Sequence, residues 1–331
     1  MTHFRLPQLR GLPIVVIAAT VAVMGIVSIL APASGAMKAA RIDRSGPDNF
    51  EGGDLSWPRT LIDFDGYPVR IHGPAKRVIS QYWSIDEFVY SVAPASHVAG
   101  VSESAYLERV SNIFEQVDRF KPLIATDPER VLRADPDLII VSSGARVDFT
   151  ALIRSTGIPI YRLATTFTTL EQLGSTIRLM GYLTGNDDAA EREYQRFREA
   201  VEAARKRKPG GVASPRILGF GGRYSYGDQT LFHDIVETLG GINVGAEGGL
   251  HGYSSVSTEQ ILRWDPEWIV AGAEAGKEEQ VRTRLLDDPA IALTQAARKQ
   301  QILIYDQRMF LPMSPFTARI LKALGEDLYG D

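Results

Sequence analysis

A repeated segment constrains the fold of this chain more than any other feature. Residues 127–140 (DPERVLRADPDLII) recur as residues 257–270 (STEQILRWDPEWIV), with Glu, Leu, Arg, Asp, Pro and Ile in register. Each copy is typical of a helix N-cap, an acidic residue in the first turn, a short helix, an Asp-Pro stop and a buried strand. The repeat therefore predicts a protein built from two related halves.

The surrounding sequence indicates the class of these halves. Uncharged apolar runs such as 138–141 alternate with helical patterns, as expected for parallel sheets covered by helices on both faces. Residues 169–208 carry apolar side chains at helical spacing, interrupted only at 185–187. We predict an α/β fold with two related lobes, parallel-rich sheets flanked by helices, one long backbone helix joining the lobes and a ligand cleft between them.

These patterns also divide the chain. The predicted first lobe is 61–168, the inter-lobe helix is 169–208, and the second lobe is 209–331. Residues 37–60 are polar and punctuated by glycine and proline, which predicts a flexible linker.

The first 36 residues differ in kind from the rest of the chain. Residues 13–33 are almost wholly apolar, and Ser34-Gly35-Ala36 provides the small residues that precede a signal-peptidase cut. We expect a signal peptide at 1–36 and a periplasmic protein. A retained N-terminal membrane anchor facing the periplasm is the alternative, because the apolar run approaches the roughly 20 residues that span a bilayer.

Charge and cysteine content exclude some classes. The formal net charge is −4 and no Lys/Arg block suggests a groove for a polyanion, so nucleic acid is not an expected partner. The chain has no cysteine, which rules out a lipoprotein anchor and disulfides.

Three further segments point to a known family. The hairpin sequence IDFDG (62–66), the following PAKRVIS (74–80) and MGYLTG (180–185) resemble the class III periplasmic substrate-binding proteins of ABC importers, which take iron-siderophores, haem or cobalamin. The resemblance covers about Leu61 to Leu328. It implies capture of a metal complex, delivery to a membrane permease dimer and a monomeric binding protein.

The same resemblance assigns a role to the repeated acids. In the family, the acid that opens the repeated helix of each lobe contacts arginines of the permease, and these positions correspond to Glu129 and Glu259. A helix-stabilising role also accounts for both residues, since a first-turn carboxylate gains about 0.3–1 kcal/mol from the helix dipole. The two roles are compatible.

The loops that follow the predicted strands are rich in aromatic and cationic residues. The candidate ligand-binding residues are Tyr82, Trp83, Tyr106, Arg146, Phe167, Arg223, Tyr224, Tyr226, His251, Tyr253, Arg308 and Phe310. Rings and guanidinium groups suit a bulky metal chelate with anionic groups, so we expect a ferric siderophore or haem, with cobalamin as the alternative. Haem would need an axial Tyr or His, for which Tyr82, Tyr224, Tyr226 and His251 are available. No intrinsic cofactor is expected.

Other classes of function are less well supported. Of the five histidines, His3 lies in the predicted signal segment and His72 in the predicted hairpin. His97, His233 and His251 remain, and none has a short metal-ligand spacing, so no bare-metal site is predicted. No nucleophile elbow, HExxH motif or cysteine nucleophile is present, so we do not predict an enzyme. A chelatase-like or reductive enzyme on the same fold, and a docking protein without ligand, remain as alternatives.

Overall fold

The computed structural model describes residues 50–119, 127–310 and 312–330. The predicted signal segment 1–36 and the first part of the predicted linker, 37–49, lie outside the described residues. Within the described part of the chain, none of the helices combines the length and the apolar character that crossing a membrane requires.

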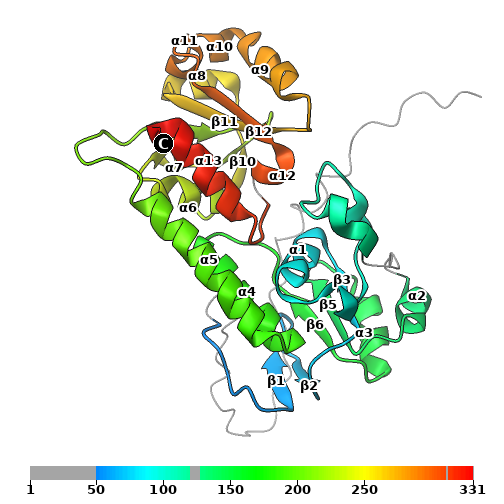
Figure 1. The fold of residues 1–331 in the computed structure, drawn as a ribbon. Coiled ribbons are helices and arrows are strands. Elements are labelled where there is room, and N and C mark those ends of the chain that lie inside the picture. Colours follow the sequence, from blue (N-terminus) through cyan, green and yellow to red (C-terminus); the bar gives the residue numbers. More distant parts are fainter. Residues whose placement is uncertain (1–49, 120–126, 311, 331) are drawn as a thin grey trace, which may run out of the picture. The chain divides into compact units, whose positions relative to one another are not determined.

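Two four-stranded parallel sheets form the centre of the fold (Figure 1). The first has the order β4-β3-β5-β6 and the second the order β9-β7-β11-β12. The strands of the first are β3 (Val78–Gln81), β4 (Val98–Gly100), β5 (Leu138–Ser142) and β6 (Ile160–Leu163). Those of the second are β7 (Arg216–Gly219), β9 (Ile242–Asn243), β11 (Trp268–Ala273) and β12 (Ile302–Asp306).

The two sheets repeat the same topology. In each, the second strand along the chain lies at one edge and the first strand lies beside it, followed by the third and the fourth. The repeated segment forms α2 (Pro128–Arg133) before β5 and α8 (Thr258–Trp264) before β11. Asp127 and Ser257 cap these helices, and both helices end before an Asp in the left-handed region, Asp135 at φ 49° and Asp265 at φ 46°. The prediction of two related α/β lobes is confirmed.

A pair of arginines extends the repeat beyond the segment visible in the sequence. Arg77, just before β3, donates from Nε to the carbonyl of Asp135 at 2.7 Å and from a guanidinium nitrogen to Ala134. Arg216, at the start of β7, donates in the same way to the carbonyl of Trp264 at 2.8 Å. Each arginine therefore ties the end of the repeated helix to the central strand of its own sheet.

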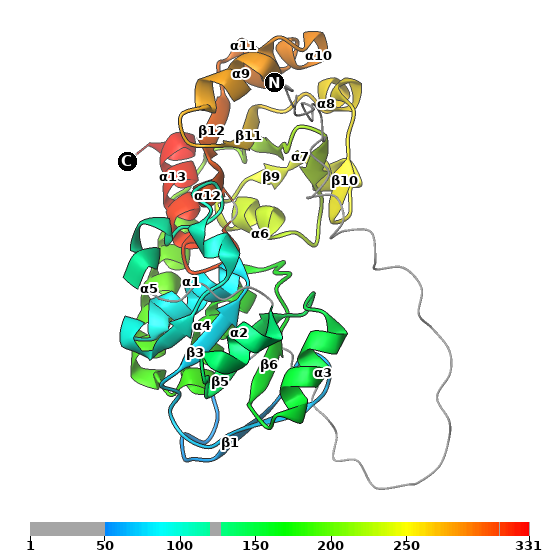
Figure 2. The ribbon, with the colours of Figure 1, turned by 90° about the vertical axis from the view of Figure 1, so that its right-hand side faces the viewer.

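Helices cover both faces of each sheet. The helices of the first lobe are α1 (Trp83–Val92), α2 and α3 (Val147–Ser155). Those of the second are α6 (Leu231–Thr238), α7 (Val244–Glu247), α8, α9 (Glu278–Leu286), α10 (Pro289–Ala292), α11 (Gln295–Arg298), α12 (Gln307–Phe310) and α13 (Thr317–Tyr329). Figure 2 shows α9, α10 and α11 on the opposite side of the second sheet from α6.

The side-chain alternation of the strands divides the core accordingly. In β3, Val78 belongs to the core cluster shared with α1, whereas Ile79 belongs to the cluster shared with α3. In the second sheet, Val270 faces α6 and α13, and Ile269 faces α8 and α9. Both sheets are thus buried on both faces, as the uncharged strands predict.

The predicted long helix is corrected by the structure. Most of residues 169–208 are helical, but they form two helices, α4 (Leu170–Thr184) and α5 (Asp187–Arg205), and the first ends at Gly185 in the left-handed conformation at φ 73°. The two helices run antiparallel, since Arg178 of α4 pairs with Glu191 of α5 at 2.8 Å. A Cβ placed on Gly181 would lie 2.3 Å from Cβ of Ala190, so a glycine is needed for this close approach. The second helix, α5, contacts α1 of the first lobe and α13 of the second.

The linker prediction is also wrong for its last part. The side chain of Arg59 is buried between the rings of Trp57 and Tyr182, and it forms an ion pair with Asp187 at 2.8 Å. Phe50 packs against Tyr182 with ring centroids 5.1 Å apart. Residues 50–58 therefore lie on the α4–α5 hairpin, and polar composition alone did not reveal this because only a few aromatic and cationic side chains hold the segment.

Two small antiparallel ladders complete the fold. β1 (Arg59–Ile62) and β2 (Pro68–Ile71) form the hairpin that Asp65-Gly66 predicts. In the second lobe, β8 (Tyr224–Tyr226) pairs with β10 (Tyr253–Ser255).

Candidate ligand-binding site

The predicted aromatic residues of the second lobe meet on the β8–β10 ladder. Tyr226 and Tyr253 are direct partners in its register, and their rings lie edge to face with centroids 5.5 Å apart. The ring centroid of Tyr226 also lies 5.2 Å from that of Phe232 and 5.7 Å from that of Phe310. Edge-to-face aromatic pairs of this kind are worth about 0.5–1.5 kcal/mol beyond the area that they bury. We call these four residues the aromatic cluster.

The first lobe contributes its aromatic residues next to this cluster. Tyr82 and Trp83 directly follow β3, are half-buried and have ring centroids 5.8 Å apart. Burial raises the pKa of the Tyr253 phenol to about 12, and the nearby Tyr82 phenol adds to the effect. Tyr82 is therefore near enough to act electrostatically on the Tyr253 phenol, and both residues pack against the same core cluster.

The phenol of Tyr253 has an unusual environment. Its oxygen is shielded from solvent and has no hydrogen-bond partner among the described residues. A buried polar atom without a partner costs about 1–3 kcal/mol. The aromatic cluster thus holds one hydroxyl group that a ligand could satisfy.

Several predicted residues occupy other surroundings. Phe167 is buried against Phe88, and Phe310 is 2% exposed within the aromatic cluster, so both are core positions in this structure. Arg146 is exposed at the start of α3 and pairs with Asp148. These residues follow strands as predicted, but the sequence does not reveal which side of the strand end each one faces.

The remaining predicted residues lie at or near the surface. Arg223 and Tyr224 are exposed at the start of β8, and Tyr106 is half-buried at the end of a 3-10 turn. Arg308 is bound to Asp306, with Nη2 and Oδ2 2.6 Å apart. Its guanidinium is therefore already neutralised by a neighbouring carboxylate.

His251 forms a pair with an acid that the sequence did not indicate. Its Nδ1 lies 2.7 Å from Oδ1 of Asp228, and its side chain is 75% exposed. The two residues sit immediately beyond the Tyr226–Tyr253 rung of the ladder. The pair is therefore adjacent to the aromatic cluster.

Two buried acids on α1 were not singled out from the sequence. Asp86 accepts hydrogen bonds from the hydroxyls of Ser80 and Ser102, each at 2.5 Å. Glu87 accepts hydrogen bonds from the backbone of Asn112 at 2.7 Å and from the hydroxyl of Ser314 at 2.5 Å. Burial raises the pKa of each carboxyl to about 7. The signal was available, because two adjacent acids interrupt an otherwise apolar run.

Glu87 connects the two lobes. It belongs to α1, whereas Ser314 precedes α13 in the second lobe. Asn112 of the first lobe adds a hydrogen bond from its amide to the carbonyl of Arg308 at 3.0 Å. This network ties Arg308 of α12 and Ser314 before α13 to the first lobe.

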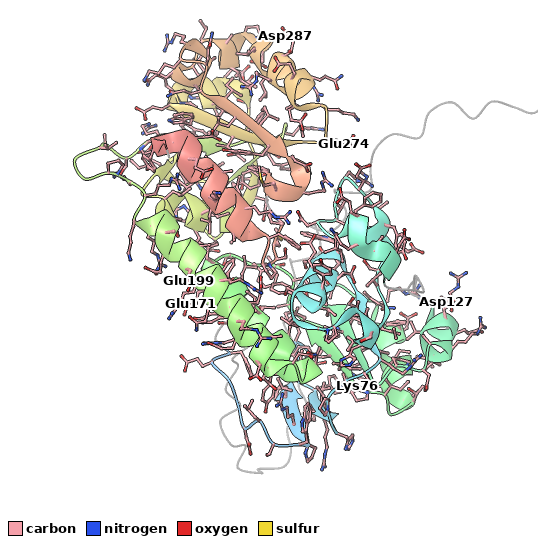
Figure 3. All side chains as sticks on the ribbon, in the orientation of Figure 1. Lys76, Asp127, Glu171, Glu199, Glu274 and Asp287 are labelled. Carbon is pink, nitrogen blue, oxygen red and sulfur yellow. The ribbon has the colours of Figure 1, made fainter. Side chains whose placement is uncertain are left out.

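The two predicted docking acids are equivalent in structure. Glu129 and Glu259 are exposed and occupy the second position of α2 and α8. A hydrogen bond from Ser257 is the main cause that lowers the pKa of Glu259. Figure 3 shows Asp127, which caps α2, at the outer end of that helix.

Two other properties of the surface bear on ligand binding. No group of three or more His, Asp or Glu side chains in the described residues is arranged to hold a metal ion. A cavity of about 620 Å³ lies at the ends of α5 and α6, between Lys208 and Gly240. It contains none of the predicted ligand-binding residues, so we do not assign the ligand to it.

Comparison with known proteins identifies the family. The family model described as "Periplasmic binding protein" matches residues 78–309, which is most of the chain. The chain belongs to this family. The match spans both sheets and the α4–α5 hairpin.

The individual relatives share only low sequence identity with this chain. A cobalamin-binding protein from Halobacterium salinarum is 28% identical over 70% of this chain, and the match spans 63% of that relative's length. A vitamin B12-binding protein from Vibrio campbellii is 25% identical over 62% of this chain and 73% of its own.

Solved structures agree on the fold. The apo periplasmic heme-binding protein RhuT from Roseiflexus sp. RS-1 has a TM-score of 0.64 and 24% identity, covering 78% of this chain and 98% of its own. An ABC-type Fe3+-hydroxamate transport protein from Saccharomonospora viridis has a TM-score of 0.63 and 20% identity, covering 82% of this chain and 99% of its own. At these identities the likeness establishes the two-lobed α/β fold.

Proposed function

We propose that this protein is the periplasmic substrate-binding component of an ABC importer, which captures a bulky metal complex and delivers it to the membrane permease. The aromatic cluster is the observation that carries the proposal, because it holds a buried phenol without a partner among the described residues, and Tyr82 of the first lobe is near enough to raise the pKa of that phenol. The cargo is an iron complex, either a ferric siderophore or haem, or alternatively a corrinoid such as those named for the cobalamin-binding relatives.

Ligand titration tests this proposal. Hemin, aquocobalamin and a ferric hydroxamate are each added to the protein while the intrinsic tryptophan fluorescence is followed, since Trp83 lies beside Tyr82. Quenching by at least one complex is expected, with roughly tenfold weaker binding for Tyr82→Ala. Tyr67→Ala, at an exposed ring on the β1–β2 hairpin, is the matched control. If none of the three complexes binds, the proposal fails.

We further propose that Glu129 and Glu259 dock the permease through Arg or Lys side chains. Two exposed carboxylates at equivalent positions on repeated helices suit paired charge-assisted contacts. Charge reversal of both residues should abolish uptake in cells and leave ligand affinity unchanged. Glu171→Lys is the matched control, because Glu171 is also an exposed acid at the second position of a helix (Figure 3). Normal uptake by the double reversal variant would refute the docking role.

A further inference from the structure

Asn112 links the two lobes through every polar atom of its side chain. Its amide nitrogen donates to Oε1 of Glu87 at 3.1 Å and to the carbonyl of Arg308 at 3.0 Å. Its side-chain oxygen accepts from the guanidinium of Arg319 at 3.3 Å. Glu87 lies on α1 of the first lobe, whereas Arg308 and Arg319 lie on α12 and α13 of the second. The reverse orientation of the amide would place its oxygen against two acceptors, so the network fits only this one.

Glu87 adds a second link between the lobes. Its Oε1 accepts the backbone N–H of Asn112 at 2.7 Å, and its Oε2 accepts the hydroxyl of Ser314 from the second lobe at 2.5 Å. Both Glu87 and Ser314 are fully buried. One turn further along α1, the ring of Tyr90 stacks on Phe316 with centroids 6.5 Å apart. The polar links at this junction are therefore shielded from water and flanked by a ring contact.

An ionised carboxylate is destabilising at this junction. Burial has the largest effect on Glu87 and raises its pKa to about 7, although the hydrogen bonds from Ser314 and Asn112 and the charge of Arg319 lower it. The effect of Arg319 is the smallest of these, and its guanidinium donates to Asn112 rather than to the carboxylate. A buried charge without a close counter-ion gains free energy when it returns to water. The closed junction therefore favours protonated Glu87, and an opened junction favours the ion.

The neighbouring acid does not act across the junction. Burial raises the pKa of Asp86 to about 7 as well, but its carboxylate accepts from the hydroxyls of Ser80 and Ser102, which both belong to the first lobe. Separation of the lobes leaves these partners in place. Asp86 is therefore an internal comparison for Glu87, with a similar titration range and with partners in one lobe only.

The other charged groups at the junction are arginines and their acidic neighbours. Arg308 pairs with Asp306 of its own lobe, and the hydrogen bond from Arg308 holds the pKa of that carboxyl below its usual range. Glu108 and Glu115 of the first lobe act on Arg308 electrostatically. Arginine keeps its charge at all pH values near neutrality. Glu87 is therefore the group that faces both lobes and titrates near neutrality.

We propose that Glu87, Asn112 and Ser314 form a proton-controlled latch, which holds the two lobes together while Glu87 is protonated and loosens when Glu87 ionises. In the protonated form, the acid O–H can donate to the Ser314 oxygen while Oε1 still accepts from Asn112. The stabilisation by this proton is fully present below pH 4.5 and is lost as the pH rises through about 7. The latch exists in the empty protein, so it does not depend on the proposed function.

Hydrogen exchange of the Asn112 backbone amide tests the latch, because this N–H donates to Glu87. The protection factor is corrected for the intrinsic pH dependence of exchange and reports the open fraction even when that fraction is small. It should fall by up to about 70-fold between pH 5 and pH 8, since opening returns the pKa of Glu87 towards 4.5. Glu87→Gln should remove most of this fall, and Asp86→Asn should retain it. Protection that does not change with pH, or an equal effect of the two substitutions, would overturn the latch.

The distance between the lobes is a second readout. The chain has no cysteine, so Leu152→Cys and Leu293→Cys, at exposed positions in the first and second lobe, accept a unique pair of spin labels. Pulsed electron spin resonance should give a wider distance distribution at pH 8 than at pH 5, and adding Glu87→Gln should keep it narrow at both. If the Asn112 protection changes with pH while the distance distribution does not, the loosening is confined to the surroundings of Asn112 and the latch between the lobes is refuted.

Discussion

Replacement of Glu87 by glutamine should make the protein more resistant to alkaline pH. Glu87 is buried and accepts hydrogen bonds from Asn112 and from the Ser314 hydroxyl. Glutamine mimics the protonated acid, because its amide oxygen can accept from Asn112 and its amide nitrogen can donate to the Ser314 oxygen when the serine hydroxyl turns away. The substitution therefore removes the charge and keeps the shape and the hydrogen bonds.

The magnitude follows from the pKa of this carboxyl, which burial raises from 4.5 to about 7. The folded state then holds the proton more tightly than the unfolded state. Stability from this group is fully present below pH 4.5 and is lost as the pH rises towards about 7. The loss amounts to about 3 kcal/mol, and Glu87→Gln avoids it.

Urea unfolding at pH 5 and pH 8, followed by tryptophan fluorescence, measures the effect. The free energy of unfolding of Glu87→Gln relative to wild type should rise by about 2.5 kcal/mol between the two pH values, since a small part of the loss has already occurred at pH 5. Asp86 titrates in both proteins, so most of its contribution cancels in the difference. Ser314→Ala removes one donor to the carboxylate and should destabilise more at pH 8 than at pH 5. Parallel pH profiles for wild type and Glu87→Gln would refute the reasoning.

Two further substitutions test the α4–α5 hairpin and the segment 50–59 that packs on it. Gly181→Ala should lower the free energy of unfolding by about 1–3 kcal/mol through overpacking against Ala190, whereas Gly210→Ala, with open space around it, should have little effect; thermal unfolding measures both. Arg59→Ala should cost about 3–5 kcal/mol in urea unfolding, since it leaves the partly buried Asp187 without its partner, and a double mutant with Asp187→Asn should recover part of the loss.

Sequence patterns predicted the lobes because each copy of the repeat contains its own helix cap, helix stop and buried strand. Asp127 and Ser257 accept from the backbone of the first turn, and the Asp-Pro pairs end both helices where the structure ends them. Caps, stops and uncharged strands act over a few residues, so their effect is readable without tertiary contacts.

The helix reversal could not be read in the same way. The apolar spacing resumes after the interruption at 185–187, and a glycine at that place is compatible with a kink or with a complete reversal. The contact between Gly181 and Ala190 decides for reversal, and it joins residues from two different helices. Helical periodicity records which face is buried but not which partner buries it.

The candidate site was predictable only in part. The strand-end rule selected Tyr82, Tyr226 and Tyr253 from the sequence; in the structure Tyr226 and Tyr253 pair across the antiparallel β8–β10 ladder, and Tyr82 is near enough to raise the pKa of the Tyr253 phenol. The burial of Phe310 and the pairing of His251 with Asp228 depend on how each loop turns after its strand. Those turns arise from long-range backbone contacts that have no local pattern.

The duplicated arginine ties have a mechanical consequence. Arg77 and Arg216 each fasten a repeated helix to the middle strand of its own sheet, so each acidic helix start must travel with its lobe as a rigid body. The span between Glu129 and Glu259 consequently changes whenever one lobe rotates against the other. A partner that binds both carboxylates would therefore respond to the rotation through the change in their separation, without contacting the cargo.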